Sequence, residues 1–179
     1  MSGGGDVESG MRICALAVLA CTAVAAAGCS PPVDLKQALQ ITDVVSGYHD
    51  AGVVEGKNKL VPGITFRLKK SVEDSLRPLS VSVSFKQLPE PGTAVPPGSP
   101  AETDWDEHFI QSVPFEGNQT ALLAFKTKPG YTADPPQTRA DILKHRLFRD
   151  VRVHVFVEHS ASKWVEIAAY DVPRQLLAH

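Results

Sequence analysis

The stretches 79-LSVSVSFKQL-88 and 151-VRVHVFVE-158 decide the fold of this chain. In both, apolar residues occupy every second position, and most of the residues between them are polar or charged. This period of two puts the two kinds of side chain on opposite faces of a β-strand, whereas the apolar positions of an amphipathic helix recur about every 3.6 residues. Each stretch therefore predicts a strand with one face turned toward a core.

A turn at 159–161 and the segment 164-WVEIAAYD-171 follow the second stretch and predict a β-hairpin. We predict four cross-strand pairs, which are Val155–Val165, Val153–Ile167, Phe156–Trp164 and His154–Glu166. The first two pairs lie on the valine face, and the other two lie on the opposite face. This register leaves an aromatic pair outside the main core.

Weaker apolar patterns predict four more strands, at 39–48, 63–70, 106–114 and 120–128. With the three strands described above, the expected number is seven. The sequence also predicts a polar turn over 52–59 and an exposed loop over 89–101, because that loop holds five prolines and two glycines.

One short helix is expected, capped by Asp134 or Thr138. Its predicted apolar side consists of Ala140, Ile142, Leu143 and Leu147. Since strands and helices do not alternate along the chain, residues 39–179 are expected to form an all-β, antiparallel, immunoglobulin-like β-sandwich of about seven strands with one short helix.

The segment 13-ICALAVLACTAVAAAGC-29 is an uncharged apolar run. It is shorter than the roughly 20 residues of a transmembrane helix, but it suits the apolar region of a secretory signal. Arg12 supplies the positive charge that precedes such a region. The first ten residues carry two acids and no base, so we hypothesise that the true start is Met11 rather than Met1.

The end of this run, Ala26-Ala27-Gly28-Cys29, resembles the lipobox of bacterial lipoproteins. The resemblance implies that residues 1–28 are a signal peptide, that Cys29 carries the lipid, and that residues 29–38 form a lipidated tether. Ser30 follows the cysteine, and in that family a residue other than Asp favours the outer membrane, on its periplasmic side in a diderm cell. The alternative is an ordinary secretory signal in which Cys29 has no special role.

The region from Ser46 to Phe85 combines Gly47-Tyr48, Pro62-Gly63, a Phe-x-Leu-Lys motif and the alternating valine strand. Together these features resemble the small immunoglobulin-like lipoprotein domains of the FxLYD type. The resemblance implies a fold and no active site.

The composition excludes several classes of function. All three cysteines lie within the first 29 residues, so the mature domain has no thiol for a disulfide, for catalysis or for zinc. With Arg12, Asp6 and Glu8 set aside, 17 basic and 18 acidic residues remain. Such a balance gives no basic face for nucleic acid, and no metal or other cofactor is predicted.

Three functions remain open. We expect a non-enzymatic interaction or accessory domain that binds an envelope protein. Phe156 and Trp164 are a possible docking patch for that partner. For these two residues we favour the alternative that the helix or the proline-rich loop covers them as a second, minor core, because large exposed apolar groups are uncommon. The second function is binding of a small ligand or carbohydrate on a platform of Trp105, Phe109 and Tyr131.

The third function is a hydrolase, which we rank last. The string 160-SASK-163 matches the S-x-x-K motif of serine β-lactamases, but its partner motifs are absent and its position in the hairpin is typical of a turn. A hydrolase would instead need a hydroxyl, an imidazole and a carboxylate brought together from distant segments.

Overall fold

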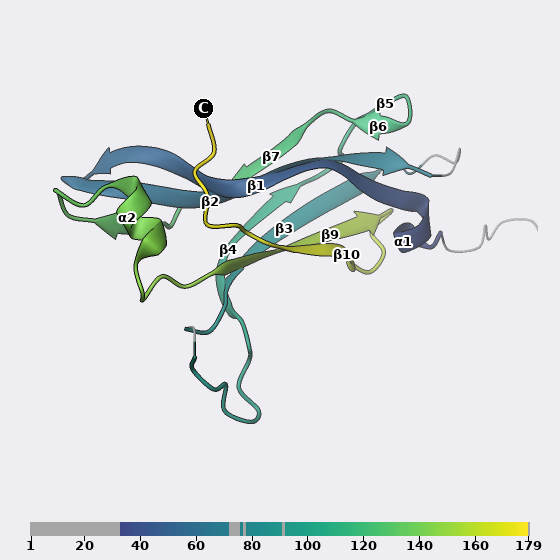
Figure 1. The fold of residues 1–179 in the computed structure, drawn as a ribbon. Helices are drawn as coiled ribbons and strands as arrows, with labels where there is room; N and C mark the ends of the chain where they lie inside the picture. The colour runs from purple at the N-terminus through teal and green to yellow at the C-terminus, as the bar shows by residue number, and fades with distance from the viewer. Residues whose placement is uncertain (1–32, 72–75, 77, 91, 179) are drawn as a thin grey trace, which may run out of the picture. The chain divides into compact units, whose positions relative to one another are not determined.

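A computed structural model describes residues 33–71, 76, 78–90 and 92–178. These residues form two antiparallel β-sheets that lie one over the other, with two short helices at their margins (Figure 1). The expected signal peptide and Cys29 lie outside the described residues. Within the described part, no helix is both long and apolar enough to cross a membrane.

The first sheet is built on a long hairpin. Its strands are β1 (Leu39–Val54), β2 (Lys57–Lys70), β5 (Phe115–Glu116), β6 (Gln119–Thr120), β7 (Leu123–Lys126) and β8 (Tyr131–Ala133). β6, β7 and β8 pair one after another with β2, so together they act as one interrupted third strand. The helices are α1 (Leu35–Ala38) and α2 (Arg139–Lys144).

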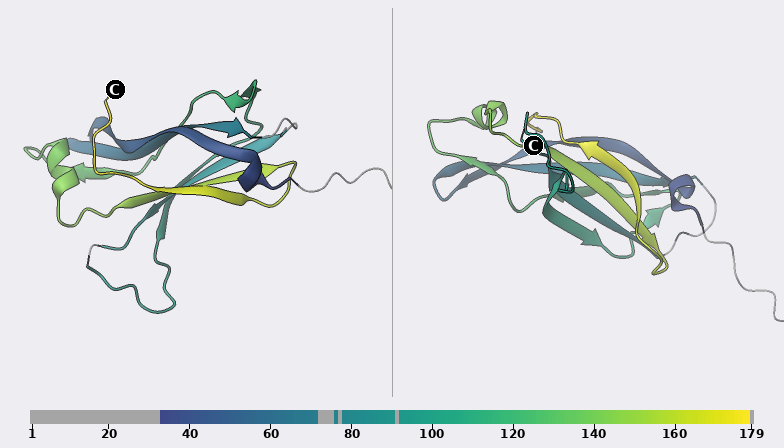
Figure 2. Two further views of the ribbon diagram at one scale, coloured as in Figure 1. Left: turned by 45° about the vertical axis from the view of Figure 1, so that its right-hand side comes forward. Right: turned by 90° about the horizontal axis from the view of Figure 1, so that it is seen from below.

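The second sheet has the order β10-β9-β3-β4. Its strands are β3 (Leu79–Gln87), β4 (Thr103–Ile110), β9 (Val151–His159) and β10 (Val165–Asp171). The loop between β3 and β4 extends away from both sheets (Figure 2). In the second sheet, β3, β9 and β10 are adjacent and correspond to strands C, F and G of an immunoglobulin domain. In the first sheet, β1, β2 and β7 are adjacent. This is the immunoglobulin-like sandwich that was predicted.

The core lies between the valine face of β3 and β9 and the inner face of β2. Four residues of β3 and four of β9 are fully buried, namely Leu79, Val81, Val83, Phe85, Val151, Val153, Val155 and Val157. Ile64, Phe66 and Leu68 of β2 are buried opposite them. Each such side chain stabilises the fold by roughly 1.5–3 kcal/mol relative to exposure, so this layer determines which way the strands face.

The seven predicted strands are all present, but the predicted register of the last hairpin is wrong. Val165 pairs with Val157 instead of Val155, and Glu166 pairs with Phe156. The turn lies one residue later than expected, because β9 continues to His159 and β10 begins at Val165. Ser160 and Ala161, which follow β9, both have positive φ.

A β-bulge in β10 then shifts the register once more. It lies between Glu166 and Ala168, and beyond it Tyr170 pairs with Val153. The bulge lets Val165, Ile167 and Tyr170 all pack against the core, which strict alternation forbids for this spacing. The free energy gained by packing these three side chains against the core therefore outweighs the regular backbone hydrogen bonding that the bulge interrupts.

Three smaller expectations also need correction. The turn predicted over 52–59 contains only Glu55 and Gly56, both with positive φ, and the strands on either side continue into that range. Thr138, not Asp134, caps α2, and its side chain forms a capping box with Asp141. Ile142 and Leu143 are buried as predicted, whereas Ala140 of α2 is exposed. Leu147 is also exposed, and it lies beyond the end of α2 at Lys144.

The expected tether of residues 29–38 overlaps the folded domain. Asp34 caps α1, and Leu35 and Ala38 are buried in the core. The compact unit thus begins at Asp34.

The C-terminal tail folds back onto β1. The Tyr48 N–H donates to the Gln175 carbonyl at 2.8 Å, and the Leu177 N–H donates to the Tyr48 carbonyl at 2.9 Å. A Cβ on Gly47 would lie 2.8 Å from Leu177 Cγ and 3.0 Å from the Gln175 oxygen. The absence of a side chain at Gly47 therefore allows the tail to dock.

We expect Gly47→Ala to destabilise the full chain by about 1–3 kcal/mol, the usual cost of overpacking. In a chain that lacks residues 175–179 the same change should cost little, because the atoms that the new methyl group meets are gone. Urea unfolding of the four proteins measures this coupling. An equal loss of stability in the full and shortened chains would contradict it.

Candidate functional site

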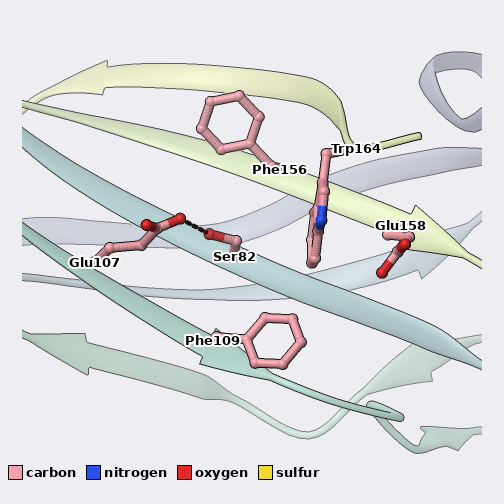
Figure 3. Close-up of a pocket in the computed structure, with 6 residues that line it drawn as sticks. All are labelled: Ser82, Glu107, Phe109, Phe156, Glu158 and Trp164. Atoms are coloured by element: carbon pink, nitrogen blue, oxygen red, sulfur yellow. Dashed lines mark hydrogen bonds between the residues drawn. The ribbon is translucent and has the colours of Figure 1, made fainter. Parts of the chain in front are cut away.

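Three aromatic side chains surround Ser82 on the outer face of the second sheet. In the sheet register Ser82 of β3 lies between Phe109 of β4 and Phe156 of β9. The short serine side chain leaves space between the two rings. A groove of about 520 Å³ results, and its lining residues are Ser82, Glu107, Phe109, Phe156, Glu158 and Trp164 (Figure 3). We call Phe109, Phe156 and Trp164 the aromatic patch.

Trp164 reaches this groove from the far edge of the sheet. It immediately precedes β10, and β10 and β4 are the two edge strands of a four-stranded sheet. Neighbouring strands lie about 4.8 Å apart, so roughly 14 Å separates the two edges. The Trp164 and Phe109 ring centroids are nevertheless only 5.5 Å apart. The indole therefore lies back across the sheet toward Phe109, on the side of the sheet that carries Ser82 (Figure 3).

Two carboxylates border the patch. Ser82 Oγ donates a hydrogen bond of 2.7 Å to Glu107 Oε1, which orients that carboxylate along the groove. Glu158 lies on β9, opposite Ser80. Among the described residues, no cationic side chain forms an ion pair with either carboxylate.

The structure brings the predicted docking residues Phe156 and Trp164 together on one face, where both are half-buried. Within the described residues, the groove gives no support to the favoured interpretation that the helix or the proline-rich loop covers them. None of the residues that line the groove belongs to α2 or to 89–101. Phe109 completes the patch and is 50% exposed.

The predicted platform of Trp105, Phe109 and Tyr131 does not form. Trp105 is the extra residue of a β-bulge in β4, and its ring packs 5.1 Å from Tyr131 at the margin of the core. Tyr131 also packs 4.2 Å from Phe148, and burial raises the pKa of its hydroxyl. Of the three aromatic residues, only Phe109 lines the groove.

A chain of ion pairs lies beside the patch. The Arg152 guanidinium donates to Asp171 at 2.7 Å and to Glu102 at 3.1 Å. His154 lies between Glu102, 2.8 Å from its Nε2, and Glu166, 3.0 Å from its Nδ1. Glu102 follows the proline-rich loop, so these contacts fix the end of that loop on the sheet.

Groups of the kinds that a hydrolase needs meet at three places in the described part of the chain. Ser160 Oγ lies 3.3 Å from His159 Nε2, Ser82 bonds Glu107, and His154 contacts two carboxylates. None of these three places joins a hydroxyl, an imidazole and a carboxylate in series. These residues also contain no group of three metal-ligating side chains arranged to hold an ion.

Sequence reasoning missed Glu107, Glu158 and the role of Phe109 in the patch. Alternation puts residues 107 and 109 on the same face of β4, which was a usable signal for their proximity. The crossing of Trp164 over the sheet had no comparable signal. Comparison with protein-family models finds no family that matches the chain, and comparison with curated proteins finds no matching relative.

The ion pair between Arg152 and Asp171 predicts an acid-dependent loss of stability. The hydrogen bonds from Arg152 lower the pKa of Asp171 below its usual value. This stabilisation is complete above the unfolded pKa of about 3.9 and is lost as the pH falls through the folded pKa. Asp171→Asn should therefore destabilise the protein at pH 6 and have a smaller effect at pH 2, measured by urea unfolding.

Arg152→Met provides the control for this prediction. In that background Asp171→Asn should no longer change the dependence of stability on pH. Persistence of the effect without Arg152 would show that another group sets the pKa of Asp171.

Proposed function

We propose that this protein is a lipid-anchored lipoprotein of the bacterial cell envelope whose β-sandwich is a non-enzymatic interaction domain. The observation that supports the docking role is the aromatic patch, which lines a shallow groove on the outer face of the second sheet and includes the half-exposed Phe109. Tryptophan and other aromatic residues are enriched at the centres of protein interfaces, where they contribute much of the binding energy.

The shape of the groove favours a protein partner over a small molecule. Small-ligand sites are usually enclosed and bury most of the ligand, whereas this groove is a shallow depression on a sheet. The separation of Trp105 and Tyr131 from Phe109 also removes the platform on which carbohydrate binding rested. None of the hydroxyl and imidazole contacts described above forms an assembled catalytic set that would support a hydrolase.

The proposal that Cys29 carries a lipid anchor is based on the sequence. Cys29 follows an apolar run and three small residues, and more than one acyl chain on the cysteine gives stable membrane attachment. Only four residues, 30–33, separate Cys29 from Asp34, where the compact unit begins. Fully extended, they span at most about 14 Å. The domain would thus stay close to the membrane that holds the lipid, which in a diderm cell is the outer membrane.

Metabolic labelling with a palmitate analogue tests the anchor. We expect label on the wild-type protein and none on Cys29→Ala, with the wild type in the membrane fraction and the variant in the soluble fraction. An unlabelled wild-type protein would reject lipidation in favour of an ordinary secretory signal.

Site-specific photo-crosslinking in the producing cell tests the docking role. A crosslinking amino acid at Phe109 should form one discrete protein adduct, which Trp164→Ala should abolish. The same amino acid at Leu122 provides a matched control, because Leu122 is also 50% exposed but lies next to β7 in the other sheet. Equal adducts from both positions, or an adduct that survives Trp164→Ala, would contradict docking through the patch.

A further inference from the structure

We infer that the aromatic patch, together with Glu107 and Glu158, binds an arginine-bearing segment of the partner protein. This inference rests on the proposed docking function and specifies its chemistry. It follows from the charges that the outer face of the second sheet leaves unpaired.

The acids of this face divide into two groups. Glu102, Asp104, Glu166 and Asp171 each pair with a cationic side chain or with His154 of the same face. Glu107 and Glu158 have no cationic partner among the described residues, and these two line the groove. The negative charge that has no ion-pair partner on this face therefore lies beside the three aromatic rings.

An arginine side chain matches this combination. Its planar guanidinium packs on aromatic faces and donates two hydrogen bonds to one carboxylate. Lysine offers only a compact charge, so it should bind less tightly. Ser82 holds Glu107 in place by a hydrogen bond of 2.7 Å, so the carboxylate is positioned before a partner arrives.

The protein already contains this arrangement inside its own fold. The Arg174 guanidinium lies 4.9 Å from the centre of the Phe148 ring and donates to both Asp150 oxygens, at 2.6 and 2.9 Å. An aromatic ring and a nearby carboxylate thus bind arginine at one place in the chain. The groove has three rings and two carboxylates but no cation of its own.

A membrane surface is the main competing occupant, because tryptophan and phenylalanine also insert into lipid headgroups. Bacterial anionic lipid attracts basic surfaces, and the two free carboxylates at the centre of this groove oppose such contact. A second copy of the chain is the other alternative. Both become outcomes of the test.

The test uses fluorescence anisotropy with the purified full-length protein and two labelled peptides, Gly-Arg-Gly-Arg-Gly and its neutral citrulline counterpart. We expect saturable binding of the arginine peptide, with affinity roughly tenfold higher than for the citrulline peptide, from cation–π and ion-pair contacts together. The double variant Glu107→Gln/Glu158→Gln should remove most of that difference, and Trp164→Ala should weaken binding as well.

The matched control is Glu55→Gln/Glu116→Gln, which changes the net charge equally at two exposed acids outside the groove. It should leave the affinity within about twofold of the wild type, because exposed charges far from the peptide contribute little. Equal effects of the two double variants, equal binding of the two peptides, or no binding would overturn the inference.

Two further measurements address the competing occupants. Trp164-dependent binding to phosphatidylglycerol vesicles would overturn the inference in favour of a lipid surface. Trp164-dependent self-association in sedimentation experiments would do so in favour of a second copy. If the Phe109 crosslink in cells requires Trp164 but is unchanged by Glu107→Gln/Glu158→Gln, the docking function stands and the arginine inference fails.

Discussion

The structure depends on the pairing of β3 with β9, which buries an unbroken layer of valines. Val81 lies beside Val157 and Val83 beside Val155, all without solvent exposure. Since side chains alternate along a strand, burying these residues sends Ser82 and Phe156 to the opposite face. A slip of one residue would expose the whole valine row. The groove and the core are therefore consequences of one register, and neither changes without the other.

Two β-bulges adapt this framework where alternation and burial conflict. In β10 the bulge lets Ile167 and Tyr170 both reach the core, although their spacing puts them on opposite faces of a regular strand. In β4 the bulge turns Trp105 toward Tyr131 and the core margin, while Phe109 stays on the outer face. The bulges thus decide which aromatic residues are structural and which are available for contact.

The sequence predicted the parts of the fold that follow from local periodicity. The seven strands, the exposed loop, the Thr138 cap and the outward direction of Phe156 and Trp164 all come from spacing or from capping chemistry within a few residues. The hairpin register was wrong, because it depends on positive φ at Ser160 and Ala161 and on a bulge that only tertiary packing favours. The docking of the tail at Gly47 joins segments far apart in sequence, which periodicity cannot detect.

The candidate site was predictable only in part, for the same physical reason. Alternation gives the face of each residue but not the direction in which a long side chain lies across that face. Trp164 meets Phe109 because the serines of β3 leave room for the indole to cross two strands. Similarly, the sequence contains many acids, and only the three-dimensional pairing of Glu102 and Asp171 with Arg152 shows which acids remain unpaired.

The proposed lipid anchor would affect how strong a contact at this groove needs to be. The groove is shallow, and its rings and exposed carboxylates each contribute modestly. If Cys29 is acylated, the short segment before Asp34 keeps the groove within reach of proteins on the same membrane surface. Confinement of two proteins to one surface raises their effective concentration, as a short linker does. A weak contact is then sufficient for association, and α1, which packs against β10, connects the anchored end directly to the sheet that carries the groove.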